Sequence, residues 1–115
     1  MEWDVRFHAA FAIEAKGFAR AAQVEIAALV GLLRRFGPQL RRPHRDTLNG
    51  SKHTNMKELR FTLADGESRI AFAFDPQRQA ILLVGGSKSG TNERQFYRDL
   101  IRVVDERFGA HLQTL

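Results

Sequence analysis

The side chains best suited to chemistry in this sequence are cations that fall on or beside one predicted sheet. Arg69 opens the apolar segment 69–74, where an unpaired charge is costly to bury, and Lys88 follows the next apolar segment. Arg69 is therefore the first candidate for a functional site. The same set contains the cations Lys52, Lys57 and Arg60 and three side chains that titrate, Tyr97, His53 and His111.

A set of this composition suits the cleavage of RNA. In that reaction the 2′-hydroxyl attacks the adjacent phosphodiester, so the protein needs no nucleophile of its own. Fixed Arg and Lys groups stabilise the charge that develops on the phosphorane oxygens, and the fork of Arg can bind two of them. Lys, Tyr or His can transfer the protons when neighbouring cations shift their pKa values. The alternative for each cation is an ordinary surface charge, which we favour for Lys57 and Arg60 taken singly.

The positive charge of the chain is concentrated in one segment. The formal net charge is +5, but residues 34–60 hold eight Lys or Arg and only two acids. A basic segment attracts polyanions, most often nucleic acid, or the acidic face of a protein partner. We therefore add Arg42 and Arg45 to Lys52 and Arg60 as candidate RNA-binding residues. The alternative is a solvated basic loop without a dedicated ligand.

Other common chemistries lack their signatures. The chain has no Cys, which excludes disulfides, thiolate metal sites and a cysteine nucleophile. Its four His residues show no metal-ligand spacing, and the segment GGSKSG at residues 85–90 lacks the spacing of a phosphate-binding loop. We expect neither a metal nor another cofactor.

Three predicted strands position the cations. Residues 57–63 alternate between apolar and polar side chains, and Asp65-Gly66 then forms a turn. Residues 69–74 are nearly all apolar, which predicts a central strand covered on both faces. Residues 80–84 predict a third strand, so residues 57–90 form an antiparallel meander.

Helices surround this meander. Residues 3–7 alternate as a first strand, and residues 9–36 have helical periodicity, with Gly17 as the point that divides them into a hairpin. Gly37-Pro38 ends the second helix, while Asn92 and Gln95 resemble a capping box for a last helix that ends at Gly109. The order predicts an α+β fold with a small, mostly antiparallel sheet and the helices packed on one face.

The length of 115 residues without an internal repeat predicts one domain over residues 1–115. The first residues do not have the pattern of a signal peptide, and no apolar run approaches the ~20 residues that span a bilayer. With the absence of Cys, these features favour a cytoplasmic location.

Four segments in this order resemble the RelE/HigB superfamily of toxins from bacterial type II toxin–antitoxin pairs, and in particular its phage Gp49-like, HigB-like branch. They are LNGSKHTNMKELR, RIAFAF, ILLVGGSKSG and RQFYRDLI, and the resemblance covers roughly residues 40–112. It implies a RelE-like fold with an N-terminal helical hairpin and a C-terminal helix, and a ribonuclease that cuts mRNA on the ribosome. It also implies a cognate antitoxin, often a helix-turn-helix protein, through which operator DNA is bound.

The resemblance extends to single positions. Arg69 matches the sheet arginine that contacts the scissile phosphate in this superfamily, and Lys88 matches a second cation. Tyr97 falls near an aromatic residue that stacks on a base or assists proton transfer, and Lys52 and His53 fall where relatives carry Lys and His for binding or catalysis. The positions with less defined roles in the branch are Lys57, Arg60 and His111.

Two other functions stay open. One is a ParE-type toxin that poisons DNA gyrase without cutting RNA, although that branch generally lacks a full set of catalytic residues. The other is a nucleic-acid binder that uses the basic loop without catalysis. The loop contains mostly Arg where ribosome-dependent relatives have more Lys, so the need for the ribosome also stays open.

The first helix offers a possible docking surface for the antitoxin. Its candidate residues are Phe11, Ile13 and Phe18. The alternative, which we favour, is that these side chains pack in the core.

Overall fold

The computed structural model describes residues 2–90 and 92–115. In chain order the elements are β1 (Asp4–Phe7), α1 (Ala9–Lys16), α2 (Arg20–Phe36), a short 3₁₀ helix η1 (Gly37–Gln39), β2 (Arg45–Thr47), β3 (Lys57–Leu63), β4 (Gly66–Phe74), β5 (Gln79–Ser87) and α3 (Glu93–Leu112).

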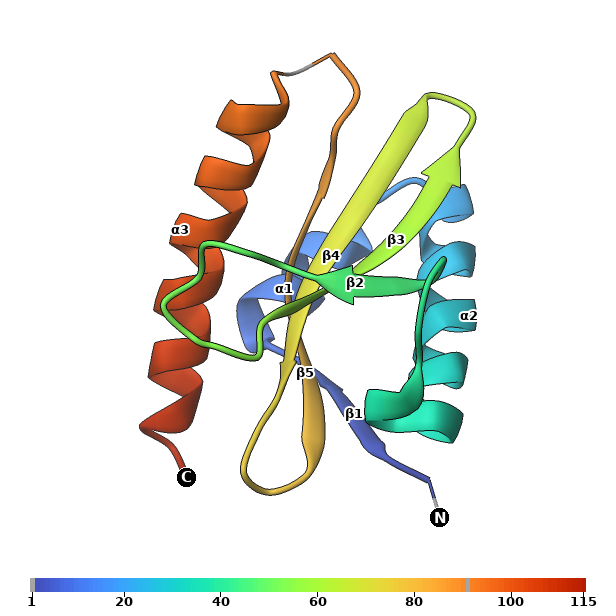
Figure 1. The fold of residues 1–115 in the computed structure, drawn as a ribbon. Helices are drawn as coiled ribbons and strands as arrows, with labels where there is room; N and C mark the ends of the chain where they lie inside the picture. The colour runs from blue at the N-terminus through green and yellow to red at the C-terminus, as the bar shows by residue number, and fades with distance from the viewer. Residues whose placement is uncertain (1, 91) are drawn as a thin grey trace.

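One five-stranded sheet organises these elements, in the order β1-β5-β4-β3-β2 (Figure 1). The pairs β2–β3, β3–β4 and β4–β5 are antiparallel, and β1 pairs with β5 in parallel. The predicted meander is therefore confirmed, and the apolar β4 is the middle strand. Its register places Arg69 opposite Arg60 of β3 and Gly86 of β5.

Helices cover both faces of the sheet (Figure 1). Ile70 and Phe72 of β4 pack in the cluster that contains the buried side chains of α1 and α2, whereas Ala71 and Ala73 pack with α3. The prediction that the helices share one face was therefore wrong. Both faces of β4 are apolar, so each face needs a cover.

The two helices of the N-terminal hairpin divide at Gly17, as predicted. Phe11 is fully buried and Phe18 is partly buried in the core, whereas Ile13 is 71% exposed. Two of the three candidate docking residues thus belong to the core. After α2, Gly37 has a positive φ of 54°, and a Cβ there would overlap the indole of Trp3, so this position requires glycine.

The last helix begins as predicted and ends later than predicted. The Asn92 side chain accepts a hydrogen bond from the backbone N–H of Gln95 at 3.2 Å. The Gln95 side chain instead donates from Nε2 to Asp99 at 3.0 Å and accepts at Oε1 from Arg98 at 3.5 Å, and the described residues show no reciprocal bond from the Asn92 backbone N–H. The helix continues past Gly109 to Leu112, which packs against the core.

Two turns meet at the end of the sheet that carries Arg69. The backbone N–H of Lys88 donates to the carbonyl of Glu67 at 2.8 Å, and the Ser89 hydroxyl donates to the carbonyl of Asp65. The β3–β4 hairpin is thereby fixed to the connection between β5 and α3. Within residues 2–90 and 92–115, no helix is both long enough and apolar enough to pass through a bilayer.

Candidate functional site

Arg69 is the centre of a polar cluster on the side of the sheet that faces α3. Its side chain is 1% exposed, with Nη1 donating to the carbonyl of Ser68 at 2.9 Å and Nη2 donating to Glu67 Oε1 at 3.3 Å. Its Nε lies 3.8 Å from Glu58 Oε2 and is buried without a hydrogen-bond acceptor among the described residues. A buried donor without an acceptor costs stability, so its presence in the middle strand suggests a functional use.

Glu58 lies beside Arg69 on the neighbouring strand and is also buried, with a side chain that is 6% exposed. The hydroxyl of Tyr97 on α3 donates to Glu58 Oε1 at 3.0 Å. Burial raises the pKa of Glu58 above its ordinary value, although the Tyr97 hydrogen bond and the charge of Arg69 oppose this shift. Burial likewise raises the pKa of Tyr97. The three side chains therefore form one buried polar group.

Lys88 lies beside Arg69, at the end of the sheet where the β3–β4 turn meets the connection between β5 and α3, which we call the rim. Its Nζ is 2.6 Å from Glu93 Oε1, 3.8 Å from Glu67 Oε2 and 5.4 Å from the centre of the Tyr97 ring. Glu67 thus contacts both Lys88 and Arg69. The Glu67 carboxylate therefore joins Arg69 and Lys88, the two cations named first in the sequence analysis.

Two further arginines, Arg60 and Arg42, are connected to this rim by ion pairs with acidic side chains. Arg60 Nη1 is 3.5 Å from Asp46 Oδ2 and its Nε is 3.8 Å from Glu58 Oε2. Arg42 Nη2 is 2.6 Å from the same Asp46 oxygen. A surface hollow of about 500 Å³ extends between the basic loop and α3. Its charged and titratable lining includes Arg42, Glu58, Arg60, Lys88, Glu93 and Tyr97.

The two candidate histidines lie elsewhere. His111 Nε2 is 2.8 Å from Asp75 Oδ2, at the turn between β4 and β5, and His111 is fourteen residues along α3 from Tyr97, a distance of about 21 Å at ~1.5 Å per residue. The His53 ring packs edge-to-face on Phe108 with a centroid separation of 5.0 Å. Both histidines thus surround Phe108, near the far end of α3 from the rim.

The three remaining candidate cations also lie outside the rim. Lys57 alternates with Glu58 along β3 and so points to the opposite face of the sheet. Arg45 donates from Nε to the carbonyl of Leu40 at 2.8 Å, which holds the basic loop in place. Lys52 is exposed next to His53, and its backbone N–H donates to Asp105 at 3.3 Å. Of the ten candidate residues, the structure groups Arg42, Arg60, Arg69, Lys88 and Tyr97.

Glu58 is the residue of this cluster that the sequence analysis missed. It is the single acid of the segment 57–63, and it lies two residues from Arg60. It pairs with Ala71 in the register, which makes it a diagonal neighbour of Arg69 across the two strands. The sequence did offer one indication of this role, since Glu58 is an acid between cations on the strand that precedes Arg69.

Acidic side chains accompany each cation of the rim. Hydrogen bonding to Arg69 lowers the pKa of Glu67, and hydrogen bonding to Lys88 lowers the pKa of Glu93. The carboxylate oxygens of these two acids occupy positions that an anionic ligand could take. Across residues 2–90 and 92–115, no three His, Asp or Glu side chains are grouped so that they could hold a metal ion.

Comparison with known proteins identifies relatives over most of the chain. The family model of the phage-derived Gp49-like proteins (DUF891) matches residues 14–109. A Mycobacterium tuberculosis protein named "Putative toxin HigB2" is 44% identical over 97 residues, which cover 84% of this chain and 48% of HigB2. "Putative toxin HigB3" of the same organism is 47% identical over 88 residues, which cover 76% of this chain and 75% of HigB3. The match thus spans about half the length of HigB2.

A solved structure supports the fold. The free-state structure of an arginine-to-alanine double mutant of E. coli toxin RelE superposes with a TM-score of 0.59 at 10% identity, covering 89% of this chain and 96% of that chain. This likeness confirms the RelE-like α+β fold. Together with the family match over residues 14–109 and the two relatives above 40% identity, it confirms the predicted resemblance: this chain belongs to the family of phage-derived Gp49-like proteins.

Proposed function

We propose that this chain is a toxin of a type II toxin–antitoxin pair and that it cleaves mRNA through attack of the 2′-hydroxyl, without a metal. The observation that carries the proposal is the buried Arg69, whose Nε has no acceptor among the described residues and which lies beside the Glu58–Tyr97 pair. The names of the two relatives, both described as toxins, support the biological setting.

Phosphate binding at this rim is an exchange of anions. Glu67 contacts both Arg69 and Lys88, and its side chain is 52% exposed, so it can turn away without leaving a cavity. A phosphate in its place would offer oxygens to the Arg69 fork and to the Lys88 ammonium. During the attack these two cations would stabilise the additional negative charge of the phosphorane.

Glu58 is the group best placed to accept the proton of the 2′-hydroxyl. Burial raises its pKa toward the pH at which the reaction runs, which makes its carboxylate a stronger base. Tyr97, hydrogen bonded to Glu58 at 3.0 Å, would orient that carboxylate. Lys88 would give a proton to the departing 5′-oxygen, so that the products are a 2′,3′-cyclic phosphate and a free 5′-hydroxyl.

The partners follow from the same proposal. The substrate would be mRNA held by the basic loop, with the ribosome as the expected place of cleavage. A cognate antitoxin, which we expect to be a helix-turn-helix protein, would neutralise the chain and bind the operator DNA. The exposed residues Arg41 and Arg42 at the start of the loop offer phosphate contacts beside the rim.

Expression of the chain with and without its genomic neighbour, followed by mapping of RNA 5′ ends, tests the proposal. New 5′-hydroxyl ends should appear on expression, disappear in the Lys88→Ala and Glu58→Gln variants, and persist in Arg102→Ala, which removes an exposed cation of α3. Ends in phase with the reading frame would mean cleavage on the ribosome. Growth arrest with a DNA-damage response and intact RNA would instead support the gyrase-poisoning alternative and overturn the proposal.

A further inference from the structure

The connection between β2 and β3 leaves the sheet and lies against α3 (Figure 1). Its two ends are fixed in the core, because Leu48 and Met56 are both buried and the backbone N–H of Leu48 donates to the carbonyl of Met56 at 3.0 Å. Between these ends lies a segment in which no residue is buried, residues 49–55, which we call the loop tip. Contacts with α3 therefore decide where the loop tip lies.

Asp105 of α3 makes polar contacts with three consecutive residues of the loop tip. Its carboxylate accepts hydrogen bonds from the Ser51 hydroxyl and from the backbone N–H of Lys52, the latter at 3.3 Å. The ring of His53 lies with Nε2 3.4 Å from the Asp105 carbonyl, and the His53 backbone N–H donates to Ser51 Oγ at 3.0 Å. A single residue of a long helix thus holds the middle of the loop tip.

Close packing accompanies these hydrogen bonds. The His53 ring lies edge-to-face on Phe108, which is buried on α3. Gly50 has a positive φ of 97°, and a Cβ there would lie 3.1 Å from the Ile101 side chain, so the backbone of the loop tip approaches α3 closely at a position that favours glycine. His53, a candidate for catalysis in the sequence, therefore contributes to the attachment of the loop tip.

The connection between β2 and β3 also forms part of the hollow of about 500 Å³ beside the rim. Residues 47–49 belong to the lining of this hollow, and α3 contributes Glu93 and Tyr97 to the same lining. The width of the hollow therefore depends on the separation between the connection and α3. Asp105, about two helical turns beyond Tyr97, fixes that separation.

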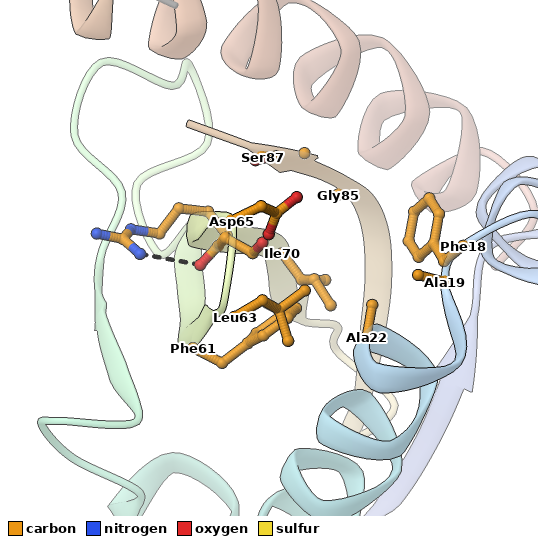
Figure 2. A pocket seen from close by; sticks show the side chains of 12 residues that line it. Phe18, Ala19, Ala22, Phe61, Leu63, Asp65, Ile70, Gly85 and Ser87 are labelled. Carbon is orange, nitrogen blue, oxygen red and sulfur yellow. Dashed lines mark hydrogen bonds between the residues drawn. The ribbon is translucent and has the colours of Figure 1, made fainter. Parts of the chain in front are cut away.

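The hollow on the opposite face of the sheet has a different character. It encloses about 210 Å³ against the start of α2, and Figure 2 shows Phe61 and Ile70 of the strands facing Phe18 and Ala22 across it. These side chains are apolar, and the strands separate them from Tyr97, which packs with α3. A phosphate backbone is therefore better accommodated on the α3 face, where the loop tip lies.

We infer that Asp105 is a positioning residue for RNA, because it holds the loop tip against α3 and so shapes the hollow before RNA enters. Asn49, which lines the hollow, and the exposed Lys52 are then already in place to contact the strand. A loop tip that moved freely would have to be ordered on binding, and ordering the backbone of one residue costs about tenfold in affinity. The inference deepens the proposed function and rests on it for the identity of the ligand.

The sign of the effect separates positioning from charge. Asp105 is an acid close to a surface that is proposed to bind a polyanion, so loss of its charge alone would strengthen RNA binding. Loss of its hold on the loop tip would instead weaken RNA binding. Asp99 is an exposed acid of the same helix that does not line the hollow, so Asp99→Ala is the matched control for charge.

The first test measures binding of an RNA hexamer that cannot be cut, because its riboses are 2′-O-methylated. Fluorescence anisotropy should show about tenfold weaker binding to Asp105→Ala than to the wild-type chain, and unchanged or tighter binding to Asp99→Ala. Asp105→Asn keeps an acceptor oxygen for the Ser51 hydroxyl and should recover most of the affinity that Asp105→Ala loses. Equal or tighter binding to Asp105→Ala would overturn the inference.

The second test separates positioning from a loss of folded protein. On the substrate that the wild-type chain cuts, free RNA or translated mRNA, Asp105→Ala should raise KM about tenfold and change kcat by no more than about twofold. A smaller folded fraction would lower kcat and leave KM unchanged, and that result would overturn the inference. Ser51→Ala removes the hydroxyl partner, so it should also raise KM, which keeps the test decisive if Asp105→Ala does not fold. The two effects should not add in the double variant, because both changes break the same contact.

The outcomes distinguish this inference from the proposed function. A chain that never cuts RNA, but binds the hexamer and loses that binding in Asp105→Ala, would refute the nuclease and support the role of Asp105. Cleavage with the same KM in Asp105→Ala, Ser51→Ala and the wild-type chain would refute the role of Asp105 and leave the nuclease intact.

Discussion

The ion pair between Arg69 and Glu58 gives a test that separates folding from cleavage. Their side chains are 1% and 6% exposed, and Arg69 Nε lies 3.8 Å from Glu58 Oε2. Two unit charges at that separation attract each other by about 4 kcal/mol when the effective dielectric constant is about 20. This attraction offsets part of the cost of removing both ions from water.

Replacement of Arg69 alone should therefore destabilise the fold. The Arg69→Met variant leaves the Glu58 carboxylate buried, with the Tyr97 hydroxyl at 3.0 Å and Arg60 Nε at 3.8 Å as its remaining partners. We expect a loss of about 3 kcal/mol in the free energy of unfolding, because one partner of a buried pair has been removed. The double variant Glu58→Gln/Arg69→Met should recover at least about 1 kcal/mol of that loss, since no buried charge is left uncompensated.

Cleavage should not recover with stability. Loss of a group that stabilises developing charge costs roughly 10²- to 10³-fold in rate, and the double variant lacks both this group and the proposed base. Urea unfolding followed by circular dichroism gives the stabilities, and single-turnover cleavage of a labelled RNA gives the rates. Arg102→Met, which removes an exposed cation of α3, should change stability by no more than about 0.5 kcal/mol and is the control.

Two results would refute this reasoning. An interaction free energy near zero between positions 58 and 69 would show that the pair does not compensate its buried charges. A double variant that folds and still cuts RNA at the wild-type rate would show that the cluster is structural and that the chemistry lies elsewhere.

Three further predictions concern pH and charge. Burial would raise the pKa of Asp75, but hydrogen bonds from His111 and the Gln79 backbone hold that pKa below its ordinary value. The ionised Asp75 therefore contributes stability above the unfolded pKa near ~3.9, and this contribution is lost as the pH falls through the lower native pKa. Asp75→Asn should lower the free energy of unfolding by about 1–3 kcal/mol at neutral pH in urea, and an unchanged acid limb of the stability profile would contradict this. Because burial raises the pKa of Glu58 and the base must be ionised, the cleavage rate should rise with pH through a value above the ordinary ~4.3, and Glu58→Gln should lack that limb in a pH–rate profile. Glu93→Gln removes the exposed carboxylate that lies 2.6 Å from Lys88 Nζ, so it should change the free energy of unfolding by less than about 1 kcal/mol. It should tighten RNA binding severalfold at low salt, and an unchanged affinity would mean that Glu93 does not compete with phosphate for Lys88.

Much of the fold could be predicted because its signals are local. The alternation of residues 57–63, the turn at Asp65-Gly66 and the apolar segment 69–74 each depend on neighbours in the sequence, and the structure confirms all three as β3, the hairpin turn and β4. Arg69 was found in the same way, as a charge within an apolar strand. Helix positions followed from the period of their apolar residues.

Features that depend on contacts between distant parts of the chain could not be predicted from the sequence. The face that each helix covers is decided by packing, and the parallel pairing of β1 with β5 joins residues far apart in the chain. His53 and His111 were candidates for the catalytic site because their segments resemble those of the toxin family, but in the structure the rings of both contact Phe108. Glu58 was missed for the opposite reason, since its role appears only when the register places it diagonally from Arg69.

The balance of charge on the rim bears on how such a site could accelerate a reaction. Four cations, Arg42, Arg60, Arg69 and Lys88, are accompanied by the four carboxylates Asp46, Glu58, Glu67 and Glu93. A phosphodiester carries one negative charge, so its exchange for one carboxylate would change the number of ion pairs little. In the proposed reaction, the affinity for RNA would therefore come largely from contacts outside the rim. The phosphorane carries more charge than the diester, so the same cations gain interaction energy as the 2′-oxygen approaches phosphorus. Displacement of an acid costs the bound diester and the phosphorane the same free energy, so it weakens binding without changing the barrier between them, and only the added charge of the phosphorane lowers that barrier.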